Sequence, residues 1–225
     1  AYAVDKSALK IKPKFVAVPE STEDICKLMR FFCQLAERDI KVAVTVRGSG
    51  SDIGGADLGN GIIISTEKLN KLLEIDPREH LVRVQAGITL KELNTALSVS
   101  GLTIPIAGKD NETIGGLISN YAVDTAAGKY GGIYNYVERL EIVLASGDCL
   151  QTNRLKRYAV AKAAAEKTPE GEIYRKIAKV LKTHGDFIRD LKRNDRGLEG
   201  YPGIVDVEKR ETVDLMPLLF GAQGT

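Results

Sequence analysis

The chain has 225 residues, 44% of them hydrophobic, which is enough to bury a core and argues against a disordered protein. Lysine and arginine outnumber aspartate and glutamate by only two (32 against 30), so no strong field steers the protein onto nucleic acid. No apolar stretch reaches the roughly 18 residues of a membrane span, and three scattered cysteines are too few for a disulfide framework. These features predict a cytoplasmic globular protein that has no integral membrane segment and binds no nucleic acid.

The first 76 residues have the pattern of a small lobe. Ser21 is placed to cap a helix whose apolar residues recur at helical spacing to about Arg38. Alternating valines at 42–46 and the apolar run 62–64 predict two strands. The glycine-rich segment RGSGSDIGG, residues 47–55, is therefore a loop that joins one strand to the next.

A hairpin and two capped helices are expected next. Two strand patterns flank a turn at residues 77–79, and Thr89 with Glu92 forms a capping box for a helix that ends near Leu97. Thr113 is placed to cap a second helix, which begins with an isoleucine and two glycines.

The last part of the chain returns to strands and then becomes helical and basic. Residues 137–144 alternate as a strand, and a Ser-Gly-Asp turn leads to a partner strand from Cys149. Residues 154–193 predict two amphipathic helices, with Thr168 and Pro169 at the start of the second. Their basic residues alternate with glutamates, which favours a solvated face over a binding surface.

The loop RGSGSDIGG fits neither of two familiar phosphate motifs. A dinucleotide fingerprint needs its glycines to open a crossover helix, but only residues 56–60 separate this loop from Gly61 and the next strand. The Gly-Lys pairs at 108 and 128 lack the Ser or Thr of a P-loop. A loop of small residues nevertheless brings successive backbone N–H groups together around an anion. The alternative is a surface turn whose glycines only adopt positive φ.

The segment Thr113–Gly116 is a second candidate for anion binding. Its amide groups and the positive end of a helix dipole would face an anion, whereas the alternative is that Gly115 and Gly116 only permit close packing. Two such loops together suit a pyrophosphate. His80 and His184 have no partner at metal-ligand spacing, so we expect no metal site, and redox chemistry would have to come from a cofactor.

Four segments, spread over the chain, carry a family resemblance. They are YAVDKSALKIKPKFVAVPESTEDI, RGSGSDIGG, PIAGKDNETIGG followed by Ser119 and Asn120, and KYGGIYNYVERLEIVLASGD. Their order and spacing resemble the FAD-binding domain of the vanillyl-alcohol oxidase and p-cresol methylhydroxylase (PCMH) type. The nearest branch contains glycolate oxidase, D-lactate dehydrogenase and D-2-hydroxyglutarate dehydrogenase.

The resemblance implies a PCMH-type α+β fold of two lobes, residues 1–76 and 77–225, with a helical insertion at about 154–193. It implies noncovalent FAD, because relatives that tether the flavin use a histidine where this loop has Ser49 and Ser51. The cofactor-binding residues that it implies are Arg47, Gly48, Ser49, Gly50, Ser51, Asp52, Ile53, Gly54, Pro105, Gly108, Thr113, Ile114, Gly115, Gly116, Ser119, Asn120, Gly131, Asn135 and Ile142.

The resemblance also implies a flavin-dependent oxidoreductase that oxidises a small 2-hydroxy acid, such as lactate or glycolate, by hydride transfer to flavin N5. The ending DLMPLLFGAQGT is similar to a segment that continues into a strand in the family, so we expect the substrate-binding cap domain to be absent and this portion alone to be inactive. The electron acceptor and the catalytic residues stay open. Two alternatives are an enzyme like UDP-N-acetylenolpyruvoylglucosamine reductase and a noncatalytic module that binds another phosphate ligand or a partner protein.

Overall fold

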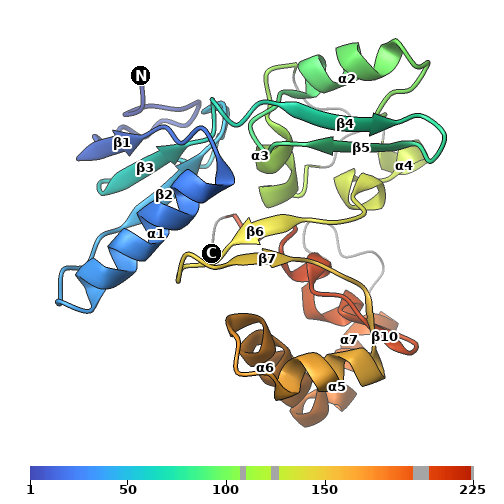
Figure 1. Ribbon diagram of the computed structural model, residues 1–225. Helices are drawn as coiled ribbons and strands as arrows, with labels where there is room; N and C mark the ends of the chain where they lie inside the picture. Colours follow the sequence, from blue (N-terminus) through green and yellow to red (C-terminus); the bar gives the residue numbers. More distant parts are fainter. Residues whose placement is uncertain (107–109, 123–126, 195–202, 224–225) are drawn as a thin grey trace.

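The computed structural model describes residues 1–106, 110–122, 127–194 and 203–223. It has the expected mixture of helices and small sheets (Figure 1). One predicted site residue, Gly108, lies outside the described residues.

The N-terminal part is a parallel three-stranded sheet with one helix beside it. The strands lie in the order β1 (Phe15–Ala17), β3 (Ile62–Ser65), β2 (Val44–Arg47), and the helix is α1 (Thr22–Ala36). Ser21 caps α1, as predicted, because its side chain accepts a hydrogen bond from the Asp24 amide. The β2–β3 connection contains no helix, so a loop alone makes this parallel crossover and starts at the carboxyl end of β2.

The second part packs a hairpin against short helices, above and to the right of the first sheet in Figure 1. Its hairpin and capped helices are those predicted, with a complete capping box between Thr89 and Glu92. Leucines and isoleucines of these elements form one buried cluster, which Met216 and Phe220 from the C-terminal segment complete. The elements are β4 (Leu72–Asp76), β5 (Leu81–Val84), α2 (Leu90–Ser98), α3 (Ile114–Ser119), α4 (Ala127–Tyr130) and the 3-10 helix η1 (Ile133–Tyr136).

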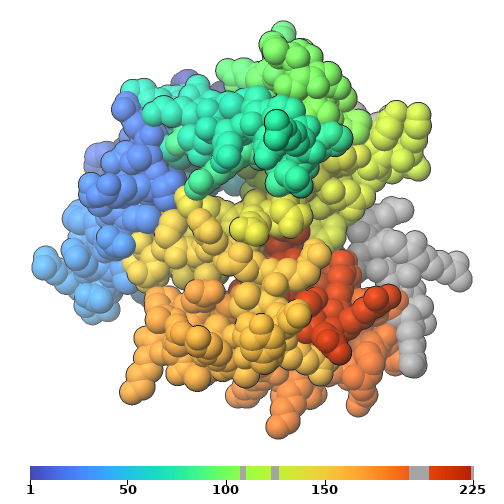
Figure 2. Space-filling model, turned by 45° about the vertical axis from the view of Figure 1, so that its right-hand side comes forward, coloured from blue at the N-terminus to red at the C-terminus, as the bar shows by residue number. Residues whose placement is uncertain are grey.

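A third group of elements contains the basic helices. Hairpin β6–β7 lies between these helices and the second part, which the yellow segment in Figure 2 shows. The region holds three helices instead of the two predicted, and it begins with a strand of a small sheet ordered β8-β10-β9. The elements are β6 (Glu141–Val143), β7 (Cys149–Gln151), β8 (Leu155–Lys156), α5 (Arg157–Ala165), α6 (Pro169–Thr183), α7 (Gly185–Asn194), η2 (Gly203–Asp206), β9 (Glu208–Lys209), β10 (Thr212–Val213) and η3 (Met216–Leu218).

Hairpin β4–β5 straddles residue 76, where the sequence places the boundary between the lobes. Its two strands are paired. Leu72 and Ile75 of β4, with Val82 and Val84 of β5, pack against the buried cluster that Met216 and Phe220 complete.

Tyr174 on α6 offers a test of the packing in the helical region. Its side chain is 1% exposed, burial raises the pKa of its hydroxyl to about 12, and that hydroxyl has no hydrogen-bond partner among the described residues. Tyr174→Phe should therefore leave the free energy of unfolding unchanged or raise it by up to about 1 kcal/mol. Tyr174→Ala should lower it by about 3 to 5 kcal/mol, because it leaves a cavity. Urea denaturation measures both, and a loss in the Phe variant comparable to that in the Ala variant would contradict the packing described.

Candidate functional site

The first loop leaves β2 with its backbone amides unused. Among the described residues, the N–H groups of residues 48–51 have no acceptor, and their side chains are hydrogens or the small Ser49 and Ser51, whose hydroxyls bond each other at 3.0 Å. Gly50 has a φ of +72°, a conformation that favours glycine. The loop thus presents a short run of free donors and small side chains, which is the chemistry of an anion nest.

Asp52 closes the nest by using the next amides itself. Its carboxylate accepts hydrogen bonds from the amides of Gly54 (2.9 Å) and Ala56 (2.8 Å). Ile53 follows with a side chain that is 77% exposed. The amide of Gly54, which the sequence predicts to lie near a phosphate, donates to Asp52 in this structure.

The second loop has the predicted cap but not the predicted free amides. Thr113 caps α3 by accepting from the Gly116 amide at 3.2 Å. The amides of Ile114 and Gly115 donate to the carbonyls of Ile88 (2.9 Å) and Ala86 (2.8 Å). The first amides of α3 are thus all engaged within the protein. The backbone packs closely at Gly115, because a Cβ there would lie 2.9 Å from the Ala86 Cβ.

The two loops nevertheless meet. A Cβ added at Gly48 would clash with Oγ1 of Thr113, so the backbone of the first loop lies directly against the cap of α3. Thr113 is itself buried, 5% exposed, and its hydroxyl is fixed by the Gly116 amide. Turns that are far apart in the sequence are thus in direct contact.

A relay of backbone hydrogen bonds fixes this arrangement. The Arg47 carbonyl accepts from the Thr66 amide (3.0 Å), and the Leu69 carbonyl accepts from the Gly87 amide (2.7 Å). The carbonyls of Ala86 and Ile88 then accept from the first amides of α3. Gly87 is not among the predicted site residues, although a glycine directly after a predicted strand is a visible signal of close approach. Any Cβ there would collide with the Thr66 carbonyl.

The remaining predicted site residues lie in four places. Ser119 and Asn120 end α3, where the Ser119 carbonyl accepts from the Gln223 amide at 3.0 Å. Gly131, with a φ of +75°, has its hydrogen side against the Asn135 side-chain amide, so these two residues are neighbours. The half-buried Pro105 precedes the second loop, and Ile142 lies at the middle of β6.

Arg47 and Asp57 form a buried ion pair under the first loop. The guanidinium Nη1 and carboxylate Oδ1 are 3.6 Å apart, and both side chains are largely buried. Asp5 is close enough to Asp57 to act on its charge. Burial, against the opposing effect of Arg47, raises the pKa of Asp57 to about 6, and the neighbouring Asp5 and Asp52 add to the rise. Burial also acts to raise the pKa of Asp5, but its bonds from Ser7 outweigh burial and lower it.

Stability should therefore depend on pH through Asp57. The unfolded chain loses this proton near the ordinary pKa of 3.8 and the folded protein near 6, so the folded state holds more protons between these values. The free energy of unfolding falls as the pH rises through that window, by at most about 3 kcal/mol, and this contribution is constant above it. Asp57→Asn should remove that part of the slope in urea unfolding, whereas Asp190→Asn, at an exposed carboxylate, should not. Equal slopes in both variants would contradict the assignment.

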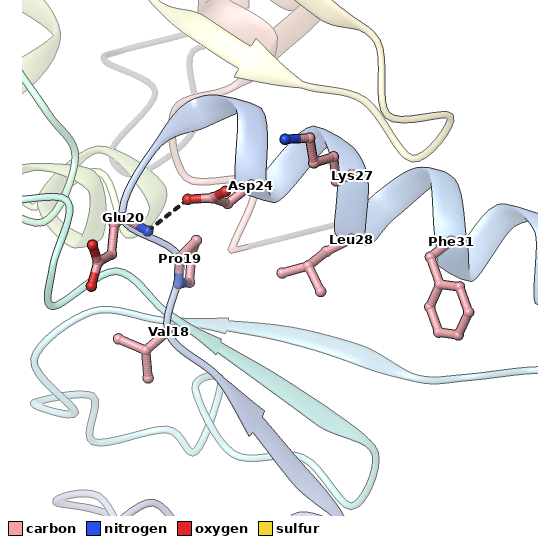
Figure 3. Close-up of a pocket in the computed structure, with 7 residues that line it drawn as sticks. All are labelled: Val18, Pro19, Glu20, Asp24, Lys27, Leu28 and Phe31. Carbon is pink, nitrogen blue, oxygen red and sulfur yellow. Dashed lines mark hydrogen bonds between the residues drawn. The ribbon is translucent and has the colours of Figure 1, made fainter.

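One hollow lies away from the two loops. It has a volume of about 520 Å³ and lies between the start of α1 and the sheet, where Leu28 and Phe31 point from the helix toward the strands (Figure 3). None of the predicted cofactor residues lines it. Its lining includes the charged residues Glu20, Asp24 and Lys27 and no residue of the two loops.

Two further findings concern metals and membranes. Within the described ranges, no three His, Cys, Asp or Glu side chains gather in a group that could hold a metal ion. None of the described helices combines the length and the hydropathy that crossing a bilayer requires.

The donor set fits the diphosphate of a nucleotide cofactor. Residues 48–51 have free amides, and glycines stand where the loop lies against Thr113 and Arg47. Such a loop suits a phosphate group, which binds to backbone donors where no bulky side chain intervenes. Ser49 and Ser51 offer no imidazole to which a flavin ring could be tethered, which fits noncovalent binding. The fold belongs to the α+β class, and the loop that leaves β2 does not follow the Rossmann pattern.

Comparisons with known proteins identify the cofactor. The family model described as "FAD binding domain" matches residues 13–153. The chain therefore belongs to the FAD-binding domain family, and its cofactor is FAD.

The most similar curated relatives include hydroxy-acid dehydrogenases. The D-2-hydroxyglutarate dehydrogenases of Pantoea ananatis (31% identical) and Escherichia coli (30% identical) match over 99% of this chain and 22% of their own length. The D-lactate dehydrogenase of Archaeoglobus fulgidus is 35% identical over 65% of this chain and 34% of its own length. The chain thus spans about a fifth of the length of the first of these relatives.

Solved structures confirm the fold. An alkyldihydroxyacetonephosphate synthase superposes with a TM-score of 0.59 at 23% identity, over 68% of this chain and 33% of the other. The 6-hydroxy-D-nicotine oxidase of Arthrobacter nicotinovorans gives 0.58 at 22% identity, over 67% and 32%. The expected PCMH-type FAD-binding fold is confirmed.

Proposed function

We propose that this chain is the FAD-binding portion of a flavin-dependent oxidoreductase that oxidises a small 2-hydroxy acid. The observation that carries the proposal is the run of free amides at residues 48–51, placed directly against the cap of α3. The substrate class follows from the relatives, which are dehydrogenases of D-2-hydroxyglutarate and D-lactate.

We assign different tasks to the two loops. The amides and hydroxyls of residues 48–51 hold the FAD diphosphate, because they are the free donors. Thr113–Gly116 forms the wall that fixes their position, since its own amides are engaged. Gly131, Asn135 and Ile142 line the flavin side of the site in this proposal.

FAD, when bound, supplies the acceptor for the hydride that leaves the hydroxyl-bearing carbon of the acid. The residues of this chain bind and orient it, and no substrate-binding or proton-accepting residue is assigned among them. The substrate-contacting cap belongs, in this proposal, to a region of the relatives beyond the matched segment. A cytoplasmic location is supported by the free thiols of Cys26, Cys33 and Cys149.

The proposal is tested by purifying the chain and titrating it with FAD, followed by calorimetry and by the visible absorbance of protein-bound flavin. We expect saturable binding with one FAD per chain. The protein encoded by the whole open reading frame that contains these residues is then mixed anaerobically with D-2-hydroxyglutarate, D-lactate or glycolate. Bleaching of its flavin by one of these acids supports the assignment, whereas a chain that ignores FAD would refute it.

A further inference from the structure

The N-terminal segment, residues 2–9, packs against the first loop. The Lys6 amide donates a hydrogen bond to the Asp52 carbonyl at 3.1 Å. A Cβ at Gly55 would lie 2.7 Å from Cδ1 of Leu9 and 3.6 Å from Oγ of Ser7, so the segment and the end of the loop are in close contact. This segment precedes the residues that the family model matches, which begin at residue 13.

Arg47 joins this segment to the loop. Its Nη2 donates to the Val4 carbonyl at 2.9 Å, and its guanidinium carbon lies 5.7 Å from the centre of the Tyr2 ring. The Tyr2 hydroxyl donates to Glu67 at 2.9 Å, which fixes the ring in turn. The guanidinium occupies the space in which a Cβ of Gly50 would stand, so the side chain folds back beneath its own loop.

The charges around Arg47 argue against a direct role in phosphate binding. Asp57 pairs with the guanidinium at 3.6 Å, and the carboxyl of Asp5 lies beside Asp57. Asp52 of the loop also contributes negative charge to this cluster. Arg47 is 7% exposed, and its one positive charge faces several carboxyls, so it offers little net attraction to an anion. Its many fixed contacts indicate that its role is to hold the backbone.

We propose that Arg47 is a positioning residue: clamped between the N-terminal segment and Asp57, it holds residues 48–51 in the shape that binds the FAD diphosphate. The proposal rests on the proposed function for its ligand. It also assigns a role to residues 2–9, which act as a latch on the loop. A diphosphate nest depends on such fixed geometry, because its donors are separate backbone amides that must point at one anion.

The latch is tested at Lys6 with two variants of the same residue. Lys6→Pro removes the N–H that bonds Asp52. Lys6→Ala keeps that N–H and removes only an exposed side chain. The first readout is hydrogen exchange, without FAD, of the Gly54 and Ala56 amides that Asp52 protects. We expect these amides to exchange about five to ten times faster in the Pro variant than in the wild type, which is the effect of one lost hydrogen bond. The Ala variant should exchange at the wild-type rate.

Arg47→Lys provides a second, independent arm. Lysine keeps the positive charge but cannot bond the Val4 carbonyl and pair with Asp57 at the same time, as the forked guanidinium does. We therefore expect faster exchange of the Gly54 and Ala56 amides and an FAD affinity that is lower by about tenfold. If Arg47 acted only through its charge, this variant would match the wild type. If Arg47→Lys fails to fold, the Lys6→Pro variant decides the question.

The outcomes separate this proposal from the proposed function. Unchanged exchange in Lys6→Pro overturns the latch, whether or not FAD binds. If Lys6→Pro exchanges faster but the wild-type protein does not bind FAD, the latch is supported and the FAD assignment is refuted. Faster exchange with unchanged FAD affinity in both variants shows that the loop shape is not what FAD requires, and it overturns Arg47 as a positioning residue.

Discussion

Replacing Gly48 by alanine is expected to lower FAD affinity by at least about tenfold, because a clash worth about 1 to 3 kcal/mol falls on the binding loop itself. The new methyl group would collide with Oγ1 of Thr113, which is buried and fixed by its bond from the Gly116 amide. Either the first loop or the cap of α3 must move. Calorimetric titration with FAD measures the loss, and circular dichroism verifies that the variant is folded.

A double-mutant cycle identifies the clash as the cause. Thr113→Ala removes the obstructing oxygen and by itself costs about 1 kcal/mol of stability as a lost cap. The pair Gly48→Ala with Thr113→Ala should bind FAD more tightly than Gly48→Ala alone. Gly128→Ala is the matched control, since a Cβ there meets no atom within 4 Å. Strictly additive losses in the pair would show that the two loops do not press on each other.

Local signals in the sequence were sufficient for the secondary structure around the site. Ser21, Thr89, Thr113 and Thr168 each cap the helix that they were expected to cap, because a capping bond spans only three residues. The hairpins were equally predictable from alternation and turn residues. The order of the loops in the chain also carried the family resemblance.

The division of tasks between the loops was not predictable in this way. Whether the amides of α3 are free depends on the Ala86 and Ile88 carbonyls, which lie more than 20 residues earlier in the sequence and reach them only after the chain folds. The same holds for Asp57, whose partners Arg47 and Asp5 belong to different segments. A buried carboxylate looks like any polar loop residue in the sequence, so its environment becomes visible only in three dimensions.

Gly87→Ala should strongly lower the free energy of unfolding, by about 3 kcal/mol or more, because the new Cβ would meet backbone that has no rotamer to change. It would collide with the Thr66 carbonyl and lie 2.9 Å from the Leu69 carbonyl, while the Gly87 amide must stay within reach of that same Leu69 oxygen. Urea denaturation against Gly128→Ala, whose Cβ meets open space, isolates the steric cost.

The same change bears on function, because residues 86–88 hold both halves of the site. On one side Gly87 bonds the segment after β3, and on the other its neighbours accept from Ile114 and Gly115 of α3. A displacement at Gly87 therefore shifts Thr113 relative to Gly48, and we expect the folded fraction of Gly87→Ala at low temperature to bind FAD more weakly than the wild type. A variant that is destabilised but binds FAD with native affinity when folded would show that this relay supports the fold without setting the geometry of the site.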